Sequence, residues 1–358
     1  MTVLVFPSSV EGCLPFLQEA KRHGRRVIGA SSVEGDPYAD RFDVWEQLPY
    51  LQDADFPQAF VDLLNRHFVK QLYTSHTPTY HFLTQHSELL PVGVTFVEPS
   101  PYDLQSDLVR DAWEGLDDRM ARIDTYAGKV GTYTYAFIAS LLHASRGMYG
   151  ECQEEKALAL CGALADAPAG DIIEIGTFFG KSAYLLNRLA TVRGIGPVLA
   201  VDSWDMQTSV QRESPIEIQD LSAVWDWEVV FNGFLLSTAA SAVDGHFNYL
   251  RKTSAEAWTV YDSGAPILSP EFGETKMIGR IALLHIDGNH DEPAVREDFD
   301  LWSSRLADGG WIVFDDYAWS HGSGPRKVAD KVVLDYGDRI LRHFVSGGAL
   351  FLKIAIRA

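Results

Sequence analysis

The chain has 358 residues, of which 46% are hydrophobic and 12% aromatic, so its composition is that of a folded globular protein. This length is about twice that of a usual domain, and we therefore expect two domains. Asp and Glu together number 49 against 30 Lys and Arg, which gives a net charge of -19. A surface of this charge repels phosphate backbones and anionic lipids, which argues against nucleic acid and membranes as partners.

The cysteines and the first residues bear on the cellular compartment. Cys13, Cys152 and Cys161 are odd in number and show no CxxC or zinc-binding spacing, so we expect a reducing cytoplasm. The opening "MTVLVFPSSV" lacks a basic segment, and its apolar run is too short for a signal sequence or a membrane helix. It is predicted to be a β-strand.

Residues 1–100 alternate short apolar runs with helical patterns, which predicts a small Rossmann-like α/β domain with a parallel sheet. Strands are expected at 3–7, 26–31, 71–76 and 92–99, and helices at 13–24 and 56–68. The segment resembles the domain that precedes the ATP-binding region of ATP-grasp enzymes, although no such region follows. Its first turn, "PSSVEG", is not the GxGxxG of dinucleotide-binding domains. A structural or substrate-positioning role and nucleotide binding both remain open.

Residues 101–150 are predicted to form a helical linker and cap. The pattern is acidic and amphipathic over 102–123 and more apolar over 133–145. The apolar segment "YTYAFIASLL" would suit the interface of a homo-oligomer, but the sequence leaves the oligomeric state open.

Residues 151–358 are predicted to form an α/β domain with a doubly wound, mostly parallel, seven-stranded sheet. Apolar strands and helical patterns alternate through this region, interrupted by a long insertion at 206–245. The last two strands are joined at Gly347 and Gly348, which predicts a C-terminal antiparallel hairpin. The strands are expected at 171–177, 198–204, 247–253, 281–288, 309–317 and, for the hairpin, within 339–356; the helices are expected at 154–166, 181–192, 255–262, 293–308 and 325–337.

The segment "DIIEIGTFFGKSA" (residues 171–183) places a glycine turn between a buried strand and a helix. Gly176 and Gly180 allow the backbone to approach a ligand closely at the carboxyl edge of the sheet. Glu174 lies inside the apolar strand, and a buried carboxylate needs a cationic or hydrogen-bonding partner. We therefore expect Glu174 to contact a positively charged or donor-rich ligand.

Asp202 ends the next strand, in "AVDSW". A carboxylate at this position can accept hydrogen bonds from both hydroxyls of a ribose. The alternative is an aspartate that only caps a helix or a turn. The glycine turn that precedes it favours the ribose.

The second half of the chain resembles the class I S-adenosylmethionine-dependent methyltransferases, because several motifs occur in the right order. These are "EIGTFFGKSA", "AVDSW", "HIDGNHDEPAVREDFDLW", "GGWIVFDDY" and the hairpin. The resemblance covers residues 151–358. Its "IDG-x-H" strand end is similar to that of small-molecule O-methyltransferases of the macrocin type. The glycine spacing in "GTFFG" is wider than the common GxGxG, which fits this subgroup and argues against NAD.

The resemblance implies a cofactor site for S-adenosylmethionine. Glu174, Gly176 and Gly180 would lie beside the methionine part, Asp202 on the ribose, and the turn at Thr253 and Ser254 near the adenine. The remaining residues implied for this site are Thr177, Ser182, Ser203 and Asp287.

Three carboxylates are expected to meet at one edge of the sheet. Asp287 ends one strand, Asp315 and Asp316 end the next, and neighbouring strands lie about 4.8 Å apart. Unpaired carboxylates at this distance raise one another's pKa, so a hard divalent cation would neutralise them, and Mg²⁺ suits such oxygen ligands. The family also places acidic metal ligands at these two strand ends. The alternative is that Asp315 and Asp316 cap a loop while Asp287 binds backbone amides.

His290 follows the acidic edge and is the candidate proton acceptor, together with Asp287, because its ordinary pKa is near neutrality. It could equally orient the loop or a carboxylate. His285 lies inside the strand and is expected to be structural. Asp291 is expected to cap the helix that follows.

The function expected from these residues is Mg²⁺-dependent O-methylation of a small molecule, with a sugar hydroxyl of a natural product as the acceptor that the resemblance implies. A metal-independent O- or N-methyltransferase with His290 as base is the closest alternative. A noncatalytic cofactor-binding partner of another tailoring enzyme is a third. The acceptor pocket is expected to be built from the 206–245 insertion, the 317–325 loop and the helical cap, which carry no transferable motif.

Overall fold

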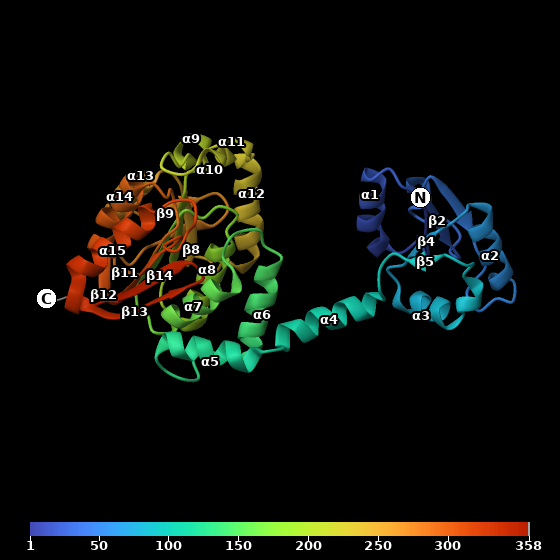
Figure 1. Cartoon of the computed structure of the whole chain (residues 1–358), viewed down its shortest axis with the longest axis horizontal. Helices are drawn as coiled ribbons and strands as arrows, with labels where there is room; N and C mark the ends of the chain where they lie inside the picture. The colour runs from blue at the N-terminus through green and yellow to red at the C-terminus, as the bar shows by residue number, and fades with distance from the viewer. Residues whose placement is uncertain (357–358) are drawn as a thin grey trace. The chain divides into compact units, whose positions relative to one another are not determined.

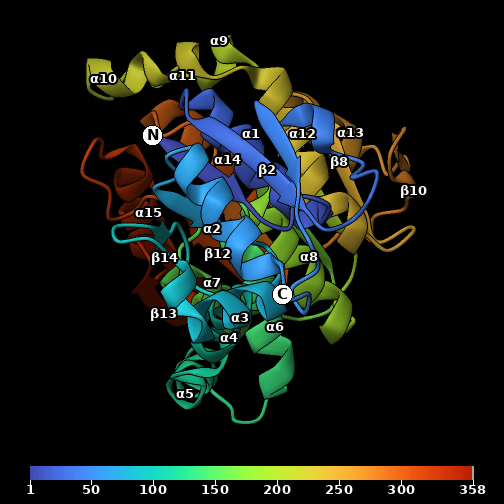
Figure 2. The same cartoon turned by 90° about the vertical axis from the view of Figure 1, so that its right-hand side faces the viewer.

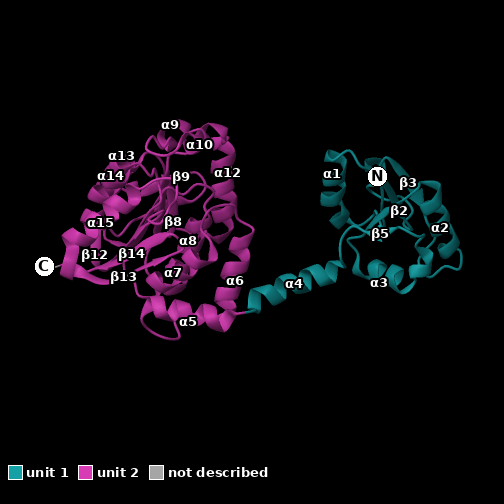
Figure 3. Ribbon diagram, viewed as in Figure 1, with its two compact units in different colours: residues 1–114 teal, residues 115–358 magenta. Residues whose placement is uncertain are grey.

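The structure is a computed structural model that describes residues 1–356, and it divides into two compact units, Met1–Glu114 and Gly115–Ala358 (Figure 3). Across the described residues, every helix falls short of the length and apolar character that crossing a bilayer requires. Each unit is described by itself below.

Unit 1 is built on a five-stranded parallel sheet in the order β3-β2-β1-β4-β5. Alternate residues of each central strand pack on opposite faces: Leu4 contacts the core under α2, and Val5 contacts the core under α1. Strands β3 and β5 lie at the edges. The strands are β1 (Thr2–Val5), β2 (Arg26–Ser31), β3 (Val44–Gln47), β4 (Gln71–Tyr73) and β5 (Thr95–Phe96), and the helices are α1 (Leu14–Arg22), α2 (Phe56–Arg66), α3 (Thr77–Gln85) and α4 (Pro101–Trp113).

Two elements of unit 1 were not predicted. Strand β3 is half-buried and reads "VWEQ", without a run of apolar residues. Helix α3 begins with Thr77 and Pro78 and buries only Thr79 and Leu83, so its amphipathic pattern is weak.

Unit 2 contains a seven-stranded sheet in the order β13-β14-β12-β11-β6-β7-β8 (Figure 1). Strands β6, β7, β8, β11 and β12 are parallel, and β14 runs antiparallel to both β12 and β13. The predicted α/β fold class, including the C-terminal hairpin, is confirmed. The strands are β6 (Asp171–Ile175), β7 (Val198–Asp202), β8 (Phe247–Arg251), β11 (Ile281–Ile286), β12 (Leu306–Phe314), β13 (Ile340–Ser346) and β14 (Ala349–Ile354).

Helices cover both faces of this sheet, because its central strands are apolar on both sides. Ile172 and Leu283 pack with the helices of one face, whereas Ile173 and Leu284 pack with those of the other. The first face carries α5 (Leu116–Ala127), α6 (Tyr135–Arg146), α7 (Glu154–Ala165), α8 (Lys181–Arg193) and α12 (Trp227–Thr238). The second carries α13 (Ser254–Asp262), α14 (Glu292–Trp302) and α15 (Gly324–Tyr336).

The segment predicted as a linker and cap contains three helices. The helix expected over 102–123 is broken at Gly115, whose φ of +64° ends α4 and starts α5. In α6, Ile138, Leu141 and Leu142 are buried in the core of this same chain, so most of the apolar surface proposed for an oligomer interface is already covered.

The insertion folds into α9 (Met206–Ser209), α10 (Ile216–Gln219) and α11 (Leu221–Val224) before it reaches α12. Figure 2 shows these short helices following one another in yellow-green. A small hairpin of β9 (Ile267–Ser269) and β10 (Gly273–Thr275) was not predicted. The helix predicted over 293–308 ends at Trp302, because a short 3-10 turn leads into β12 at Leu306.

Candidate active site

A cavity of about 790 Å³ opens at the carboxyl ends of β6, β7, β11 and β12. This is the edge at which doubly wound sheets bind their ligands. The predicted site residues that line it are Gly176, Thr177, Ser182, Asp202, Ser203, Thr253, Ser254, Asp287, His290, Asp315 and Asp316. Glu174 and Gly180 do not lie on its surface. Tyr149 and Gly150 of the predicted cap also reach it, whereas α5 and α6 pack on the helices of the sheet.

The glycine turn brings two strand ends close together. A Cβ on Gly176, whose φ is +81°, would lie 2.0 Å from the carbonyl oxygen of Asp287, so only glycine fits there. A Cβ on Gly180, whose φ is +82°, would lie 2.9 Å from the ring of Phe234. Gly180 therefore serves the packing of α12, and Gly176 brings β11 against the cavity.

Asp202 holds the glycine turn through its carboxylate. Its Oδ2 accepts hydrogen bonds from the backbone N–H of Thr177 and Phe178, both at 2.9 Å, and its Oδ1 accepts one from Trp204 at 2.7 Å. Burial raises the pKa of Asp202, and these hydrogen bonds oppose that shift. A carboxylate has about four acceptor positions, so about one is left for a hydroxyl in the cavity.

Backbone strain collects at the same edge. Phe178, Trp204 and Asp316 have φ values of +51°, +45° and +51°, a conformation that side chains with a Cβ seldom adopt. All three follow strands that end at the cavity. Such strain persists where the surrounding structure enforces it, which is common at functional sites.

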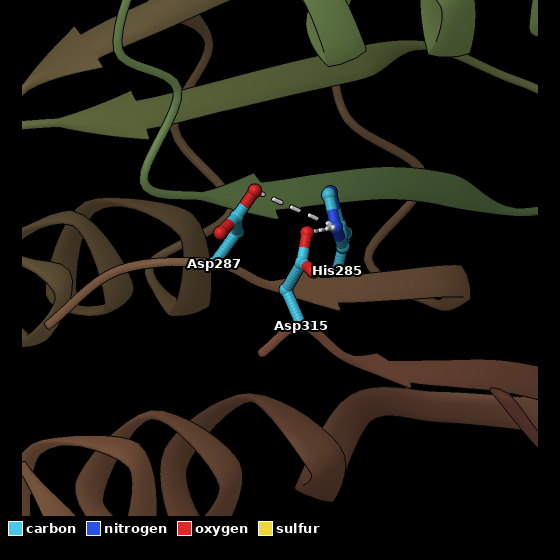
Figure 4. A group of neighbouring side chains, drawn as sticks. All are labelled: His285, Asp287 and Asp315. Atoms are coloured by element: carbon cyan, nitrogen blue, oxygen red, sulfur yellow. Dashed lines mark hydrogen bonds and ion pairs between the residues drawn. The ribbon is translucent and has the colours of Figure 1, made fainter. Parts of the chain in front are cut away.

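His285 lies at the centre of a buried polar network (Figure 4). Its Nδ1 is 3.1 Å from Glu174 Oε1, and its Nε2 is 3.1 Å from Asp315 Oδ2 and 3.8 Å from Asp287 Oδ2. Burial alone would lower the pKa of His285, but the hydrogen bonds to Asp315 and Glu174 raise it to about 10. Glu174 Oε1 thus has a partner inside the chain, whereas its Oε2 is buried without a hydrogen-bond partner among the described residues.

Lys156 is a site residue that sequence reasoning missed. It lies in the first turn of α7, is 3% exposed, and its Nζ contacts Asp315 Oδ2 and lies 3.9 Å from Asp287 Oδ2. Burial opposes the charged form, but the carboxylates of Asp315 and Asp287 hold the pKa of Lys156 well above its usual range. The available signal was a lone lysine at the start of a run of ten buried positions, "KALALCGALA".

The two carboxylates beside Lys156 are shifted in opposite directions. Burial and the charge of Asp315 raise the pKa of Asp287 well above its usual range. Burial also acts on Asp315, but Lys156 and His285 hold its pKa well below the usual range. Asp315 is therefore the charged partner of Lys156 and His285.

The three predicted metal ligands do not form one group. Asp287 belongs to two sets of neighbouring ligand atoms, each within 4.8 Å: an inner group with His285 and Asp315, and an outer group with His290 and Asp316. Asp315 turns inward to Lys156, whereas Asp316, in its left-handed conformation, turns toward His290.

His290 belongs to the outer group. Its Nε2 is 3.0 Å from Asp316 Oδ2, and its ring meets the ring of Trp319 edge to face at 4.7 Å. Its Nδ1 is buried without a hydrogen-bond partner among the described residues. Asp316 therefore orients the imidazole, and the outer group offers two carboxylates and one imidazole to a cation, of which Asp287 also lies 3.9 Å from Lys156 Nζ.

Two neighbours of His290 fasten the insertion. Asn289 Nδ2 donates to the carbonyl oxygens of Thr208 and Val210, and the carboxylate of Asp291 accepts from the backbone N–H of Arg212 and Glu213. Asp291 does occupy the N-cap position of α14, but its side chain makes no cap hydrogen bond. The polar cluster after β11 thus ties residues 208–213 to the site.

Thr253 and Ser254 begin α13 at another part of the cavity. Thr253 forms a capping box with Glu256, and Ser254 Oγ accepts a hydrogen bond from Trp302 Nε1 at 2.9 Å. Asp298 of α14, 5% exposed, reaches the same place and was not predicted. Burial raises the pKa of Asp298 to about 7, although its hydrogen bond with Ser254 acts to lower it.

One side of the cavity is an aromatic wall made of Tyr149, Phe178, Phe179, Trp225 and Trp227. The rings contact one another mostly edge to face or tilted, at centroid distances from 4.9 to 6.4 Å. Phe178 and Phe179 come from the glycine turn, and the two tryptophans come from the middle of the insertion, before and at the start of α12. No sequence motif joins these segments.

Residues 173–317 match the family model described as a methyltransferase domain. The chain carries a methyltransferase domain. The resemblance to class I S-adenosylmethionine-dependent methyltransferases is thereby confirmed, and the sheet order agrees with it. The cavity has groups that suit S-adenosylmethionine, namely the glycine turn, the Asp202 carboxylate and the hydroxyl of Thr177. The hydroxyl oxygen of Thr177 is buried without a hydrogen-bond partner among residues 1–356.

Several solved methyltransferase structures are similar to this chain at low identity. The O-methyltransferase NovP is 14% identical over 71% of this chain and 99% of its own, with a TM-score of 0.39. The calicheamicin methyltransferase CalS11 is 14% identical over 72% of this chain and 94% of its own, with a TM-score of 0.40. The mycinamycin-pathway methyltransferase MycE, in complex with Mg, SAH and mycinamycin VI, is 15% identical over 52% of this chain and 45% of its own, with a TM-score of 0.30. At these values the reaction has to be argued from the site itself.

Proposed function

We propose that the methyltransferase domain transfers the methyl group of S-adenosylmethionine to a hydroxyl oxygen of a small molecule, such as a sugar of a natural product. The observation that carries this proposal is that one cavity joins the glycine turn to the outer group of Asp287, His290 and Asp316. A cofactor on the first and a hydroxyl on the second would lie side by side. Bound S-adenosylmethionine supplies a sulfonium methyl group that an oxygen nucleophile can attack.

The chain's own residues have separate tasks in this proposal. Asp202 and Thr177 bind the ribose and methionine side of the cofactor, and Thr253, Ser254 and Asp298 lie at the part of the cavity assigned to the adenine. Asp287 accepts the hydroxyl proton, through its carboxylate oxygen that does not hold the cation, when the outer group is occupied; without a cation, His290, oriented by Asp316, accepts it. The aromatic wall excludes water from one side and binds an apolar face of the acceptor.

The charge of the cavity favours a neutral or cationic acceptor. Its lining includes seven carboxylates and three lysines, and one of those lysines, Lys156, is already paired with Asp315. The carboxylates are Glu151, Asp202, Asp287, Glu297, Asp298, Asp315 and Asp316, and the other lysines are Lys181 and Lys252. A phosphorylated acceptor would meet net repulsion here.

A divalent cation, with Mg²⁺ as our proposal, would be held by Asp287, Asp316 and His290. Such an ion supplies positive charge that lowers the pKa of an acceptor hydroxyl. Asp315 is left out of this set because Lys156 and His285 already bind its carboxylate. Metal-free transfer with His290 as base is the second candidate, because the contact with Asp316 fixes its imidazole without any ion.

The test is tritium transfer from methyl-labelled S-adenosylmethionine to a panel of monosaccharides, macrolide glycosides and flavonoid glycosides. We expect a labelled, O-methylated product whose formation falls at least tenfold after chelation and recovers with Mg²⁺. Full activity after exhaustive metal removal, together with loss of activity in His290→Asn, supports the metal-free candidate instead. If the chain fails to bind S-adenosylmethionine in calorimetry, methyl transfer is refuted altogether.

We further propose that the protein acts in a reducing cytoplasm. Its three cysteines are all buried as free thiols in the structure. Burial raises the pKa of Cys161 above the range in which a thiolate forms at neutral pH, so this thiol is expected to be unreactive.

A further inference from the structure

The inner group already contains a cation, the ammonium of Lys156. Its Nζ contacts Asp315 Oδ2 and lies 3.9 Å from Asp287 Oδ2, so it faces both carboxylates that a metal would need at this position. The lysine comes from α7, and the two carboxylates follow β11 and β12. This arrangement therefore depends on how α7 is placed against the sheet.

The tip of the C-terminal hairpin holds Lys156 in place. A Cβ on Gly347 would lie 2.5 Å from the backbone nitrogen of Lys156, so the turn rests directly on the first turn of α7. Ser346 Oγ also donates a hydrogen bond to the carbonyl oxygen of Glu155, at 3.1 Å. Two separate contacts thus fix the backbone from which the ammonium extends.

Three of the about four acceptor positions of the Asp315 carboxylate are already used. Its Oδ1 accepts the backbone N–H of Asp316 at 2.9 Å. Its Oδ2 is shared by Lys156 Nζ and His285 Nε2. Asp315 is 3% exposed and already paired with the Lys156 ammonium, so a second cation would find at most one free acceptor position and would be repelled by a like charge.

Both ring nitrogens of His285 also have partners already. Its Nε2 faces Asp315 and its Nδ1 faces Glu174, each at 3.1 Å. An imidazole that donates to carboxylates through both nitrogens has no lone pair to offer a metal. Counted with Glu174, the group contains the cations Lys156 and His285 together with three carboxyl groups, of which Asp315 and Glu174 pair with them directly.

We propose that Lys156 is the permanent internal cation of the inner group, so that Asp315 is not a metal ligand and a divalent cation enters only through Asp287, His290 and Asp316. Lys156 is then a positioning residue, because its ion pair sets the place of the Asp287 carboxylate at the edge of the outer group. This inference deepens the proposed function, but metal uptake is measured without methyl transfer, so the two can fail separately.

The experiment is a Mn²⁺ titration of the full chain, followed by the loss of the free-ion EPR signal. In the wild-type background, Asp316→Asn should abolish uptake at the outer group, and Asp315→Asn should leave uptake within about twofold of the wild type. Lys156→Met should gain one Mn²⁺ per chain, because the inner carboxylates lose their cation. The gain should disappear in the double variant Lys156→Met with Asp315→Asn.

Lys181→Met is the matched control, since Lys181 lines the same cavity but bonds the carbonyl oxygen of Gly150 instead of a carboxylate. Its Mn²⁺ stoichiometry should equal that of the wild type. Circular dichroism checks that each variant is folded, and Lys156→Gln replaces Lys156→Met if the latter is not. Loss of wild-type uptake in Asp315→Asn, or a folded Lys156 variant that gains no Mn²⁺, overturns the proposal.

Discussion

Replacing Asp202 with alanine tests whether this carboxylate supports both the glycine turn and the cofactor. Its two oxygens accept three backbone N–H groups, from Thr177, Phe178 and Trp204. Asp202→Ala leaves all three donors without this partner. Two of them belong to Phe178 and Trp204, whose strained left-handed backbone has to be held by its surroundings, including these hydrogen bonds.

The magnitude follows from these three bonds. A donor left without a partner costs about 1–3 kcal/mol, and the lower end applies here because water can enter the cavity and bind these groups. We therefore expect Asp202→Ala to lower the free energy of unfolding by about 3 kcal/mol. S-adenosylmethionine should also bind at least about tenfold more weakly, which is about 1.4 kcal/mol, because the turn is no longer ordered and the remaining acceptor position is lost.

The assays are urea denaturation, for the free energy of unfolding, and calorimetric titration with S-adenosylmethionine. Asp205→Ala is the control: this exposed aspartate accepts two backbone N–H groups at the start of α9, and its loss should cost about 1 kcal/mol with no effect on cofactor affinity. An Asp202→Ala protein as stable as Asp205→Ala would refute the structural part. Wild-type affinity for the cofactor would refute the binding part.

Three other perturbations follow from the site. The pKa of Asp298 in the folded state is about 7, above its ordinary value of 3.8, so the folded state holds the proton more tightly and the free energy of unfolding falls as pH rises between these values. Asp298→Asn should remove that fall, and its free energy of unfolding at pH 8 should be roughly 2–4 kcal/mol higher than that of the wild type. Gly347→Ala should destabilise the chain more than Gly348→Ala in urea denaturation, because both have positive φ but only the first Cβ would strike Lys156. Trp225→Ala should raise the KM of the acceptor about tenfold in the tritium assay, with unchanged S-adenosylmethionine affinity, since its ring belongs to the aromatic wall that we propose binds the acceptor. An unchanged KM would remove Trp225 from the proposed acceptor site.

The periodicity of the sequence determined the α/β architecture of unit 2. Buried strands such as β6 and β11 read as mostly apolar runs, and each is followed by a helical pattern, so the parallel sheet and its hairpin were predictable from local signals. Because parallel strands deliver their carboxyl ends to one edge, the same signals also placed Asp202, Asp287, Asp315 and Asp316 around one cavity.

Boundaries and weak elements depended on packing instead. Helix α14 ends at Trp302, although the helical pattern continues to Asp308, because β12 begins at Leu306 and pairs with β11. The β9-β10 hairpin has only three residues in each strand, which leaves no period to detect.

The partners of the polar groups were decided only by the tertiary structure. Lys156 and Asp315 are 159 positions apart, and His285 and Glu174 are 111 apart, so no spacing in the sequence announces either pair. The sequence showed acidic residues at the edge and suggested that a metal must neutralise them. The fold brings Lys156 and His285 to the carboxylate of Asp315. The left-handed backbone of Asp316 turns its side chain away from that of Asp315. Such pairing depends on how helices and strands pack, and not on the order of residues along the chain.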